Sequence, residues 1–371
     1  MKLLFAVKTM DSRGGGAERV LAQITASLAQ RGHDVTLLTF DSPDSPDFYP
    51  IDSNVHRIWL SGGRRQTRTS AWDLMKRVSA LRRTFRGDPP DVAIGFMHSA
   101  YIPLALAAIG RAIPVIASEH IVWSYYDDRP LDRLVLHATA RRYACTTFVF
   151  PGNEQGFPTA MARQSTVIPN PIVDSSATSA DPVGGPEKML LNVGRLTYQK
   201  DQATLIEAFA RIARRFPEWR LRIVGEGELR GALESQVQRL QLGGKVELPG
   251  AVRDISEEYA RAQLFVLPSR YESFGLATAE ALAAGLPVVG FADGAGTSAL
   301  IKDEVNGLLV TGHDRVGALA DALDRLMGSP VERTRLGSAG PTSVDHFSLP
   351  RIVTAWESLL QRLGRSTRAG A

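Results

Sequence analysis

Short apolar runs alternate with amphipathic stretches from one end of the chain to the other. The expected strands are 3–7, 35–40, 55–60, 92–96, 115–117 and 147–150 in the first half, and 189–193, 221–224, 246–248, 264–267, 288–290 and 307–310 in the second. Strands that alternate with helices in this way favour parallel sheets covered on both faces. The sequence therefore predicts an α/β protein.

A stretch rich in Pro, Gly, Ser and Asp, residues 168–188, separates the two sets of strands and is typical of an interdomain linker. We place the N-terminal domain at residues 1–170 and the C-terminal domain at 171–347, with a last helix within 348–371. Both domains are expected to be doubly wound and Rossmann-like, and to face each other across a cleft. Ligands of such sheets bind at the carboxyl ends of the strands.

The composition is that of an ordinary folded protein of two-domain length, with 371 residues, 44% hydrophobic and 22% charged. The one cysteine, Cys145, rules out an internal disulfide and fits a reducing cytoplasm. The first residues, MKLLFAVKTMDS, are too soon charged for a signal peptide, and no apolar run reaches the roughly 18 residues that span a bilayer. We expect a cytoplasmic protein whose contact with a membrane is peripheral.

The segment from Arg57 to Arg86 is strongly basic, with nine basic residues and one acidic residue. Its cations are Arg57, Arg64, Arg65, Arg68, Lys76, Arg77, Arg82, Arg83 and Arg86, and the apolar residues Trp72, Leu74, Met75, Val78, Leu81 and Phe85 are interleaved at helical spacing. Such a helix could lie on an anionic membrane, bind nucleic acid, or pack its apolar stripe on its own domain. We favour the membrane surface and expect no nucleic acid partner.

Two carboxylates eight positions apart mark the segment ESFGLATAE, Glu272 to Glu280. A buried strand is expected just before it, and the apolar run 276–284 reads as a helix that starts near Gly275. Glu272 then lies on the loop after the strand, and Glu280 lies about a turn and a half into the helix. A helix N-terminus exposes N–H groups and the positive end of a dipole, which suits a phosphate.

A second candidate anion site is the glycine-rich loop of residues 12–16, between the first strand and the helix that follows it. Glycines let backbone N–H groups approach a ligand closely. The loop lacks the G-x-G-x-x-G fingerprint of dinucleotide-binding domains. A tight turn between strand and helix is the alternative interpretation.

These motifs together resemble glycosyltransferase family 4. The resemblance runs nearly end to end through GGGAER (14–19), NVGRLTYQKD (192–201), IVGEGELR (223–230), LPGAVRD (248–254), the Glu272–Glu280 segment and EVNGLLV (304–310). It implies the GT-B fold, retaining transfer from a nucleotide-sugar, and a terminal helix that crosses back to the N-terminal domain. The likeness is greatest to bacterial enzymes that extend lipid-linked oligosaccharides or exopolysaccharides.

The resemblance also implies roles for residues of the second half. Arg195 and Lys200 would stabilise the diphosphate that leaves, because cations must carry this charge where no metal does. The chain has no Asp-x-Asp pair, so we expect no metal and no cofactor. Glu280 would accept hydrogen bonds from the ribose, and Glu272 would face the transferred sugar or its α-phosphate.

Backbone groups complete the donor site that the resemblance implies. The N–H groups of Phe274, Gly275 and Leu276 would hold phosphate or sugar oxygens, and Gly15 and Gly16 would lie near the diphosphate and the acceptor.

Two histidines end expected strands in the first half. The family places a histidine after its fifth strand, close to the donor sugar, and His120 matches that position. His98 ends the preceding strand and could face the same cleft. In the second half, Arg253 follows a strand where the base pocket is expected.

The resulting hypothesis is a retaining glycosyltransferase that moves a sugar from a nucleotide-sugar, most simply a UDP-sugar, to a hydroxyl of a lipid-linked glycan at the cytoplasmic membrane face. A soluble acceptor, and a non-catalytic partner that binds nucleotide-sugars, are the alternatives. A GT-B epimerase or phosphorylase is a further one.

Overall fold

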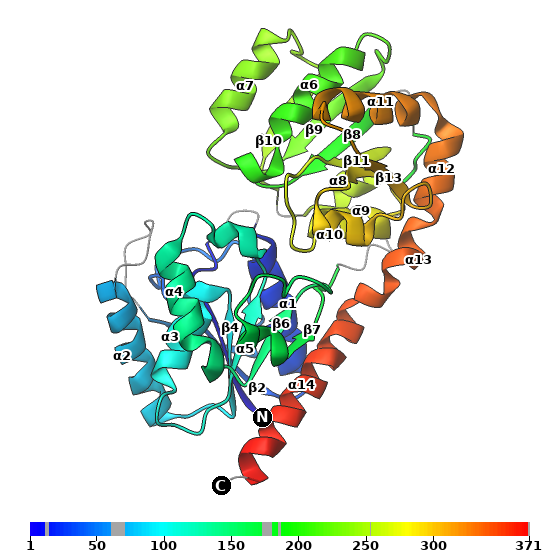
Figure 1. The fold of residues 1–371 in the computed structure, drawn as a ribbon. Coiled ribbons are helices and arrows are strands. Elements are labelled where there is room, and N and C mark those ends of the chain that lie inside the picture. Colours follow the sequence, from blue (N-terminus) through cyan, green and yellow to red (C-terminus); the bar gives the residue numbers. More distant parts are fainter. Residues whose placement is uncertain (12–14, 61–70, 173–179, 185–186, 253, 370–371) are drawn as a thin grey trace. The chain divides into compact units, whose positions relative to one another are not determined.

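The computed structural model describes the chain except residues 12–14, 61–70, 173–179, 185–186, 253 and 370–371. The chain divides into two compact units, Met1–Asn170 with Leu349–Ala371, and Pro171–Ser348 (Figure 1). Each unit contains one parallel sheet with helices packed against it. The predicted class, two doubly wound α/β domains, is therefore confirmed.

The sheet of the N-terminal unit has the order β3-β2-β1-β4-β5-β6-β7. Its strands are β1 (Lys2–Val7), β2 (Asp34–Thr39), β3 (Val55–Trp59), β4 (Val92–Phe96), β5 (Val115–Glu119), β6 (Cys145–Phe148) and β7 (Ser165–Val167). The first six overlap the runs expected to be strands, although β6 begins and ends two residues earlier than expected. The edge strand β7 was not predicted, because its three residues include Ser165 and Thr166 and form no apolar run.

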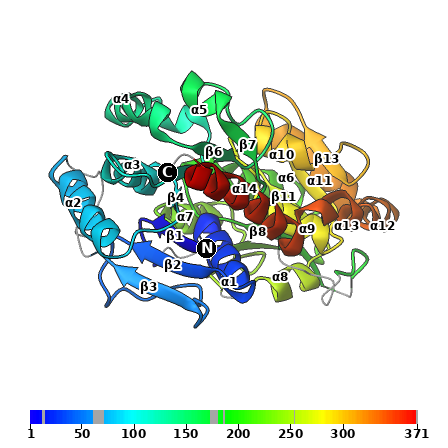
Figure 2. The same ribbon diagram turned by 90° about the horizontal axis from the view of Figure 1, so that it is seen from below.

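Helices cover both faces of this sheet. On one face α1 (Gly16–Gln30) and α14 (Leu349–Ala369) lie side by side (Figure 2). The other face is covered by α2 (Ala71–Gly87), α3 (His98–Ala107) and α4 (Pro130–Thr139), whose buried side chains share one apolar cluster with the strands. Three short helices complete the unit: η1 (Trp123–Tyr126), η2 (Ala140–Arg142) and α5 (Thr159–Arg163).

Aromatic contacts hold α14 on the N-terminal sheet. The Trp356 ring stacks on Phe96 with centroids 6.1 Å apart, and meets Phe5 edge-on at 6.4 Å. At the end of α1, Arg31 Nη1 and His33 Nε2 contact the Glu357 carboxylate at 2.6 and 3.2 Å. The last helix of the chain is therefore part of the N-terminal unit.

The sheet of the C-terminal unit has the order β10-β9-β8-β11-β12-β13. Its strands are β8 (Lys188–Val193), β9 (Trp219–Val224), β10 (Val246–Gly250), β11 (Leu264–Leu267), β12 (Val288–Phe291) and β13 (Gly307–Val310). All six were predicted, most of them as apolar runs bounded by turn residues, although β9 and β10 alternate buried apolar residues with Arg222 and Glu247.

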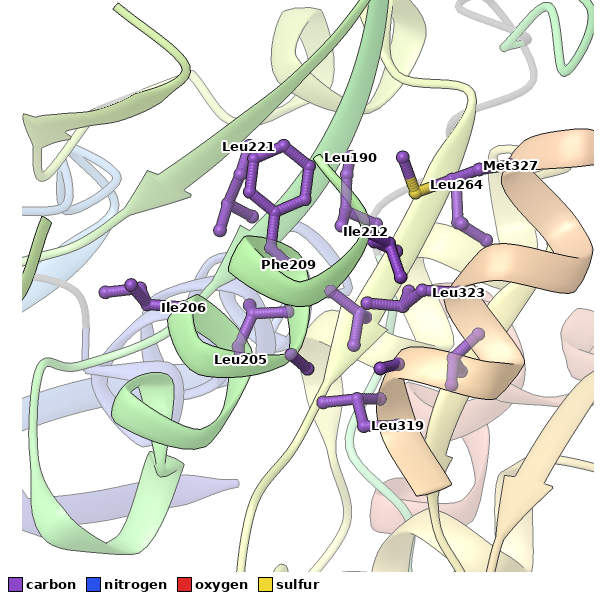
Figure 3. Packing of buried hydrophobic residues seen from close by; sticks show 14 of the residues in the cluster. Leu190, Leu205, Ile206, Phe209, Ile212, Leu221, Leu264, Leu319, Leu323 and Met327 are labelled. Atoms are coloured by element: carbon purple, nitrogen blue, oxygen red, sulfur yellow. The ribbon is translucent and has the colours of Figure 1, made fainter. Parts of the chain in front are cut away.

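The core of this unit lies between the sheet and two helices that pack on each other, α6 (Gln202–Ile212) and α11 (Arg315–Gly328). Figure 3 shows leucine, isoleucine and phenylalanine side chains of α6 directed toward those of α11 and of the strands. Elsewhere α9 (Leu276–Ala283) packs on β11 and β12, and α13 (Gly340–Val344) packs on α9. The remaining helices are η3 (Tyr198–Lys200), α7 (Arg230–Arg239), α8 (Ser256–Arg261), α10 (Ala295–Leu300), α12 (Pro330–Ser338) and η4 (Asp345–Phe347).

The C-terminal part of the basic segment forms helix α2, with its residues divided between core and surface. Leu81 and Phe85 are buried in the core, whereas Trp72 and Met75 are 62% and 61% exposed. Arg77 is also buried, with its guanidinium 4.7 Å from the centre of the Phe40 ring. Arg77 is therefore not among the cations of this segment that are exposed to bind a membrane surface.

The other cations of this segment fall into three groups. Arg57 is held inside the unit by Thr39 and Asp47, with bonds of 2.9 Å to each. Lys76, Arg82, Arg83 and Arg86 are exposed on α2. Arg64, Arg65 and Arg68 lie outside the described residues. Among the helices of the described residues, none is both long enough and apolar enough to cross a membrane.

We expect Trp356→Ala to lower the free energy of unfolding of the N-terminal unit by about 3–5 kcal/mol, because it empties a fully buried aromatic site. Urea unfolding followed by circular dichroism measures this. The matched control is Trp72→Ala, which removes an exposed tryptophan from α2 and should change stability by no more than about 0.5 kcal/mol. Equal unfolding midpoints for wild type and Trp356→Ala would show that α14 does not stabilise the unit.

Candidate active site

The order of strands reverses beside the first strand of each sheet. In the C-terminal unit β8 pairs with β9 on one side and with β11 on the other. Open parallel sheets bind ligands at the carboxyl ends of the strands where the order reverses. The loop after β8 carries Arg195 and Lys200, and the loop after β11 carries Glu272 and Gly275. The structure thus brings together motifs that lie some seventy residues apart.

An ion pair joins these two loops. Lys200 Nζ contacts Glu272 Oε1, and Ser269 Oγ donates to the same oxygen over 2.7 Å. Glu272 is only 5% exposed. A carboxylate this deep is tolerated when a cation and a hydrogen-bond donor compensate for its lost hydration. Both charged residues were predicted as site residues, but their pairing was not.

Further contacts fix the two loops against each other. Arg270 N donates to Gln199 O over 2.8 Å, and Gln199 Nε2 donates to Tyr271 O over 3.0 Å. Asp201, buried and held at φ +52°, accepts from Arg270 Nη2 at 3.1 Å. Sequence reasoning missed these residues. The positive φ of a residue other than glycine is a strained conformation that surrounding contacts must maintain.

Helix α9 begins at the second of these loops. Gly275 precedes it at φ +76°, a left-handed conformation that glycine adopts without strain, and this N-cap residue has no side chain with which to cap the helix. The first N–H groups of a helix have no partner within it, so those at Leu276 and its neighbours point out of the helix end. Phe274 is buried against Phe347, with ring centroids 5.1 Å apart. The structure therefore places the N-terminus of α9 directly after the loop that carries Glu272, the partner of Lys200.

Glu280 lies in the fifth position of α9 and is 4% exposed. Its Oε2 accepts a hydrogen bond from the Tyr259 hydroxyl of α8 over 3.0 Å. Tyr259 was not predicted as part of the site, since a tyrosine on a short helix carries no sequence signal of a partner so far along the chain.

Arg195 is exposed, while its backbone oxygen accepts from Gln202 Nε2 over 3.0 Å. The loop after β9 packs closely against the backbone just before Arg195. A Cβ on Gly225 would lie 2.0 Å from Gly194 O. Only glycine fits there, and this contact sets the course of the backbone that leads to Arg195. Arg253, expected near the base, lies outside the described residues.

In the N-terminal unit the order of strands reverses between β1 and β4. Gly15 precedes α1 as its N-cap residue, and Gly16 is the first residue of the helix. His98 is the first residue of α3, directly after Met97, which has φ +68°. His120 follows β5 directly, as predicted.

His120 is held among neighbours of the sheet. Its Nε2 lies 3.0 Å from Ser118 Oγ, and its ring stacks on Phe96 with centroids 4.7 Å apart. Burial lowers the pKa of His120 to about 4, against a smaller opposing effect of its hydrogen bond with Asn170. The imidazole is therefore neutral at pH 7, with one ring nitrogen that donates a hydrogen bond and one that accepts.

The residue before it, Glu119, is fully buried and accepts hydrogen bonds from the hydroxyls of Tyr101 and Tyr126 at 2.6 and 2.9 Å. Burial raises the pKa of Glu119 to about 7, although these hydrogen bonds oppose the rise. The Tyr126 oxygen also lies 3.0 Å from His98 Nδ1. Neither tyrosine was predicted as part of the site.

Among the described residues, no group of three or more His, Cys, Asp or Glu side chains is arranged to hold a metal ion. The expectation that the protein needs no metal and no cofactor stays a prediction.

Two protein-family models match the chain. The model described as "Glycosyl transferase 4-like domain" matches residues 15–171, and the model described as "Glycosyl transferases group 1" matches residues 179–343. Together they cover most of both units and leave out helix α14.

The chain also resembles named proteins over nearly its whole length. The Campylobacter jejuni enzyme GalNAc-alpha-(1->4)-GalNAc-alpha-(1->3)-diNAcBac-PP-undecaprenol alpha-1,4-N-acetyl-D-galactosaminyltransferase is 27% identical over 97% of this chain and 98% of its own. Sucrose-phosphate synthase from Thermosynechococcus elongatus matches with a TM-score of 0.86 and 23% identity, covering 98% of this chain and 99% of that one. Anabaena HepE, solved with UDP and glucose, matches with a TM-score of 0.80 and 20% identity, covering 98% and 100%. The structural likenesses confirm the GT-B fold.

The low pKa of His120 makes a testable contribution to stability. Because its pKa is lowered from 6.5 to about 4 on folding, the unfolded chain binds more protons between these pH values. The stabilisation is present at pH 7 and is lost as the pH falls through this range. Between about pH 7 and 4, wild type should therefore lose a few kcal/mol more of its free energy of unfolding than His120→Gln does.

Urea unfolding at a series of pH values measures this difference. Comparison between variants is needed because Glu119, with its raised pKa, has the opposite pH dependence and stabilises the fold as the pH falls below 7. His56→Gln, which alters an exposed histidine of β3, is the control and should follow wild type. Parallel curves for wild type and His120→Gln would contradict the assignment of a neutral, buried imidazole.

Proposed function

The chain belongs to the glycosyltransferases that join a 4-like domain to a group 1 domain, and we propose that it is a retaining enzyme that moves a hexosyl or N-acetylhexosaminyl group from a nucleotide-sugar to a hydroxyl of a lipid-linked glycan. The observation that carries the proposal is the pair of fixed loops after β8 and β11. They combine a part-buried cation, a buried carboxylate and a helix N-terminus preceded by glycine at the ligand-binding edge of one sheet.

Lys200, Arg195 and α9 are assigned to the diphosphate. When the bond between the sugar and the diphosphate breaks, negative charge grows on the leaving oxygen, and groups already oriented toward that charge lower the barrier. Lys200 is held in place by Glu272, so little of its freedom is lost during the reaction. Arg195 adds a planar fork of donors, and the N–H groups of Phe274, Gly275 and Leu276 add the dipole of α9.

Glu280 is assigned to the ribose. A buried carboxylate can accept hydrogen bonds from two adjacent hydroxyls, and bonds to a charged acceptor are stronger than those between neutral groups. The bond from Tyr259 fixes the carboxylate before the ligand arrives. HepE has been solved with UDP and with UDP-glucose, which supports a UDP-sugar as the donor.

The transferred sugar is assigned to His120, Glu272 and His98, and the glycine-rich loop at Gly15 and Gly16 to the diphosphate and the acceptor. The acceptor hydroxyl attacks the anomeric carbon on the face from which the diphosphate leaves, and a phosphate oxygen takes the hydroxyl proton. The new glycosidic bond keeps the configuration of the donor. Arg195 and Lys200 supply the positive charge, so the proposed reaction uses no metal and no cofactor.

A lipid-linked acceptor is supported by the name of the Campylobacter relative, which acts on an undecaprenol-linked glycan. We assign the exposed face of α2 to the anionic surface of the membrane that holds such an acceptor. This face combines Trp72 and Met75 with the cations Lys76, Arg82, Arg83 and Arg86. Tryptophan favours the membrane interface, and cations are attracted to anionic headgroups. The protein would then act at the cytoplasmic face of the membrane.

The experiment that tests this function measures release of nucleoside diphosphate from UDP-, GDP- and ADP-sugars, with and without polyprenyl-diphosphate glycans. We expect turnover of one donor, stimulated by the lipid-linked acceptor, with the anomeric configuration retained in the product. Stimulation by soluble oligosaccharides alone would favour a soluble acceptor. Tight binding of a UDP-sugar with no turnover in any combination would favour a non-catalytic binding partner.

Glu280→Ala should weaken binding of UDP by roughly 10- to 100-fold, because two hydrogen bonds between the ribose and a charged acceptor are lost. Isothermal titration calorimetry with UDP measures the change, and circular dichroism checks the fold. Asp321→Ala, which removes an exposed carboxylate from α11 of the same unit, is the control and should bind UDP as wild type does. Unchanged affinity in Glu280→Ala would remove Glu280 from the donor site.

Replacing Arg82, Arg83 and Arg86 together with Glu should lower binding to anionic vesicles by roughly 100-fold, since each cation near the headgroups contributes about 1 kcal/mol. Sedimentation with phosphatidylglycerol vesicles at low salt measures the bound fraction. Phosphatidylcholine vesicles and high salt should both reduce binding of the wild type.

The control has the same change in net charge in the other unit. Arg211, Arg215 and Arg239 are exposed cations there, and their replacement by Glu should leave vesicle binding nearly unchanged. If both triple variants lose binding equally, net charge rather than α2 is responsible, and the membrane role of this helix fails.

A further inference from the structure

The carboxyl group of Glu119 connects three elements of the N-terminal unit. Its Oε1 accepts the backbone N–H groups of His120 and Ile121 at 2.9 and 3.0 Å, in the loop after β5. Its Oε2 accepts the hydroxyl of Tyr101 from α3 and that of Tyr126 from η1. Four donors thus surround one buried carboxylate, which is the arrangement expected of an ionised acceptor.

The Tyr126 hydroxyl has a single proton and lies 2.9 Å from Glu119 Oε2 and 3.0 Å from His98 Nδ1. The Tyr101 hydroxyl is also within hydrogen-bonding reach, but it donates its own proton to Glu119 Oε2. A carboxylate can only accept, so Tyr126 must donate its proton to Glu119. Its oxygen then accepts from His98, which requires that Nδ1 carries the imidazole proton. The other ring nitrogen, Nε2, is left with a lone pair.

His98 lies at a position where the nitrogen that carries the proton can affect a bound ligand. It is the first residue of α3, at the carboxyl end of β4 where the order of strands reverses, and its side chain is only partly buried. Among the described residues, none is hydrogen-bonded to Nε2. The kinked backbone at Met97, φ +68°, directs the chain from β4 into this helix.

Burial lowers the pKa of His98 to about 4, so the ring is neutral at pH 7 and has two possible tautomers. The charged groups that act on it are Asp132 and Arg129 of the α4 segment and Lys8 after β1. Beside Glu119, the other titratable groups are the buried hydroxyls of Tyr101, Tyr126 and Tyr143, all of which have raised pKa values. These groups stay neutral at pH 7, so the ionisation of Glu119 is what can change the direction of the hydrogen bonds.

We propose that Glu119 is a positioning residue that acts through Tyr126 to keep the proton on Nδ1 of His98, so that Nε2 accepts a hydrogen bond from a hydroxyl of a bound sugar. The part that concerns the sugar rests on the function proposed above. The relay Glu119–Tyr126–His98 does not, because it follows from the three side chains alone.

Glu119→Gln tests the relay with almost no change of shape. The amide oxygen can keep the two backbone N–H groups, while the amide nitrogen donates to both tyrosines. Tyr126 then has to turn its proton toward His98 Nδ1, and the imidazole proton moves to Nε2. NMR of the protein labelled with 15N-histidine distinguishes the tautomers, and His98→Gln identifies the signals of His98.

At about pH 8, where Glu119 is ionised, we expect the Nδ1–H tautomer in wild type and the Nε2–H tautomer in Glu119→Gln. The same tautomer in both proteins would overturn the relay. In a Tyr126→Phe background Glu119→Gln should have no further effect on His98, and an undiminished change there would exclude Tyr126 as the link. Tyr143→Phe, which removes a buried hydroxyl bonded to Thr139 instead, should leave His98 as in wild type.

Turnover tests the role toward the sugar. Loss of one hydrogen bond to a sugar hydroxyl should lower kcat/KM by roughly 10- to 100-fold in Glu119→Gln. In wild type, kcat/KM should rise with pH through about 7 as Glu119 ionises, and this rise should be absent from the variant. A rise in KM for the donor alone or for the acceptor alone would identify which sugar His98 contacts.

The two parts of the proposal can fail separately. A reversed tautomer with unchanged kcat/KM and an unchanged pH profile would overturn the role toward the sugar. If no nucleotide-sugar is turned over at all, the proposed function fails, and the NMR comparison still supports or overturns the relay.

Discussion

Parallel pairing throughout both sheets is the constraint on which the candidate site depends. It places all carboxyl ends at one edge of each sheet, and the crossovers that start from β8 and from β11 proceed in opposite directions. Their loops therefore diverge and leave room at that edge for a ligand to bind backbone groups. Arg195, Lys200 and Glu272 are on these loops because the chain reverses there. Gly15 and His98 occupy the equivalent loops after β1 and β4.

Buried carboxylates recur at these edges. Glu272, Glu280 and Glu119 would each be costly in an apolar interior, and each is compensated by specific donors: a lysine and a serine, a tyrosine, and two tyrosines with two backbone N–H groups. A carboxylate held in this way has one orientation. The same bonds that make its burial tolerable also prepare it for a ligand, so stability and function have a common origin in this fold.

Periodicity predicted most of the fold. The apolar runs were sufficient to find most of the long strands, because a strand buried on both faces is apolar along nearly its whole length. The edge strand β7 was missed since pairing on one side demands little apolar surface. For α2, spacing indicated an amphipathic helix but not its surroundings: Leu81 and Phe85 face the core, Trp72 and Met75 face solvent, and Arg77 is buried beside Phe40.

The sequence by itself determined the two α/β domains, the family, and the positions of Lys200, Glu272, Glu280 and His120 at the ends of strands and the start of a helix, because these follow from local pattern and motif. Only the tertiary structure decided which side chains meet. The ion pair of Lys200 with Glu272, and the chain of bonds from Glu119 to His98, join residues of different elements and loops. Such contacts depend on how strands are ordered in a sheet and how far each loop reaches, and no local pattern records either.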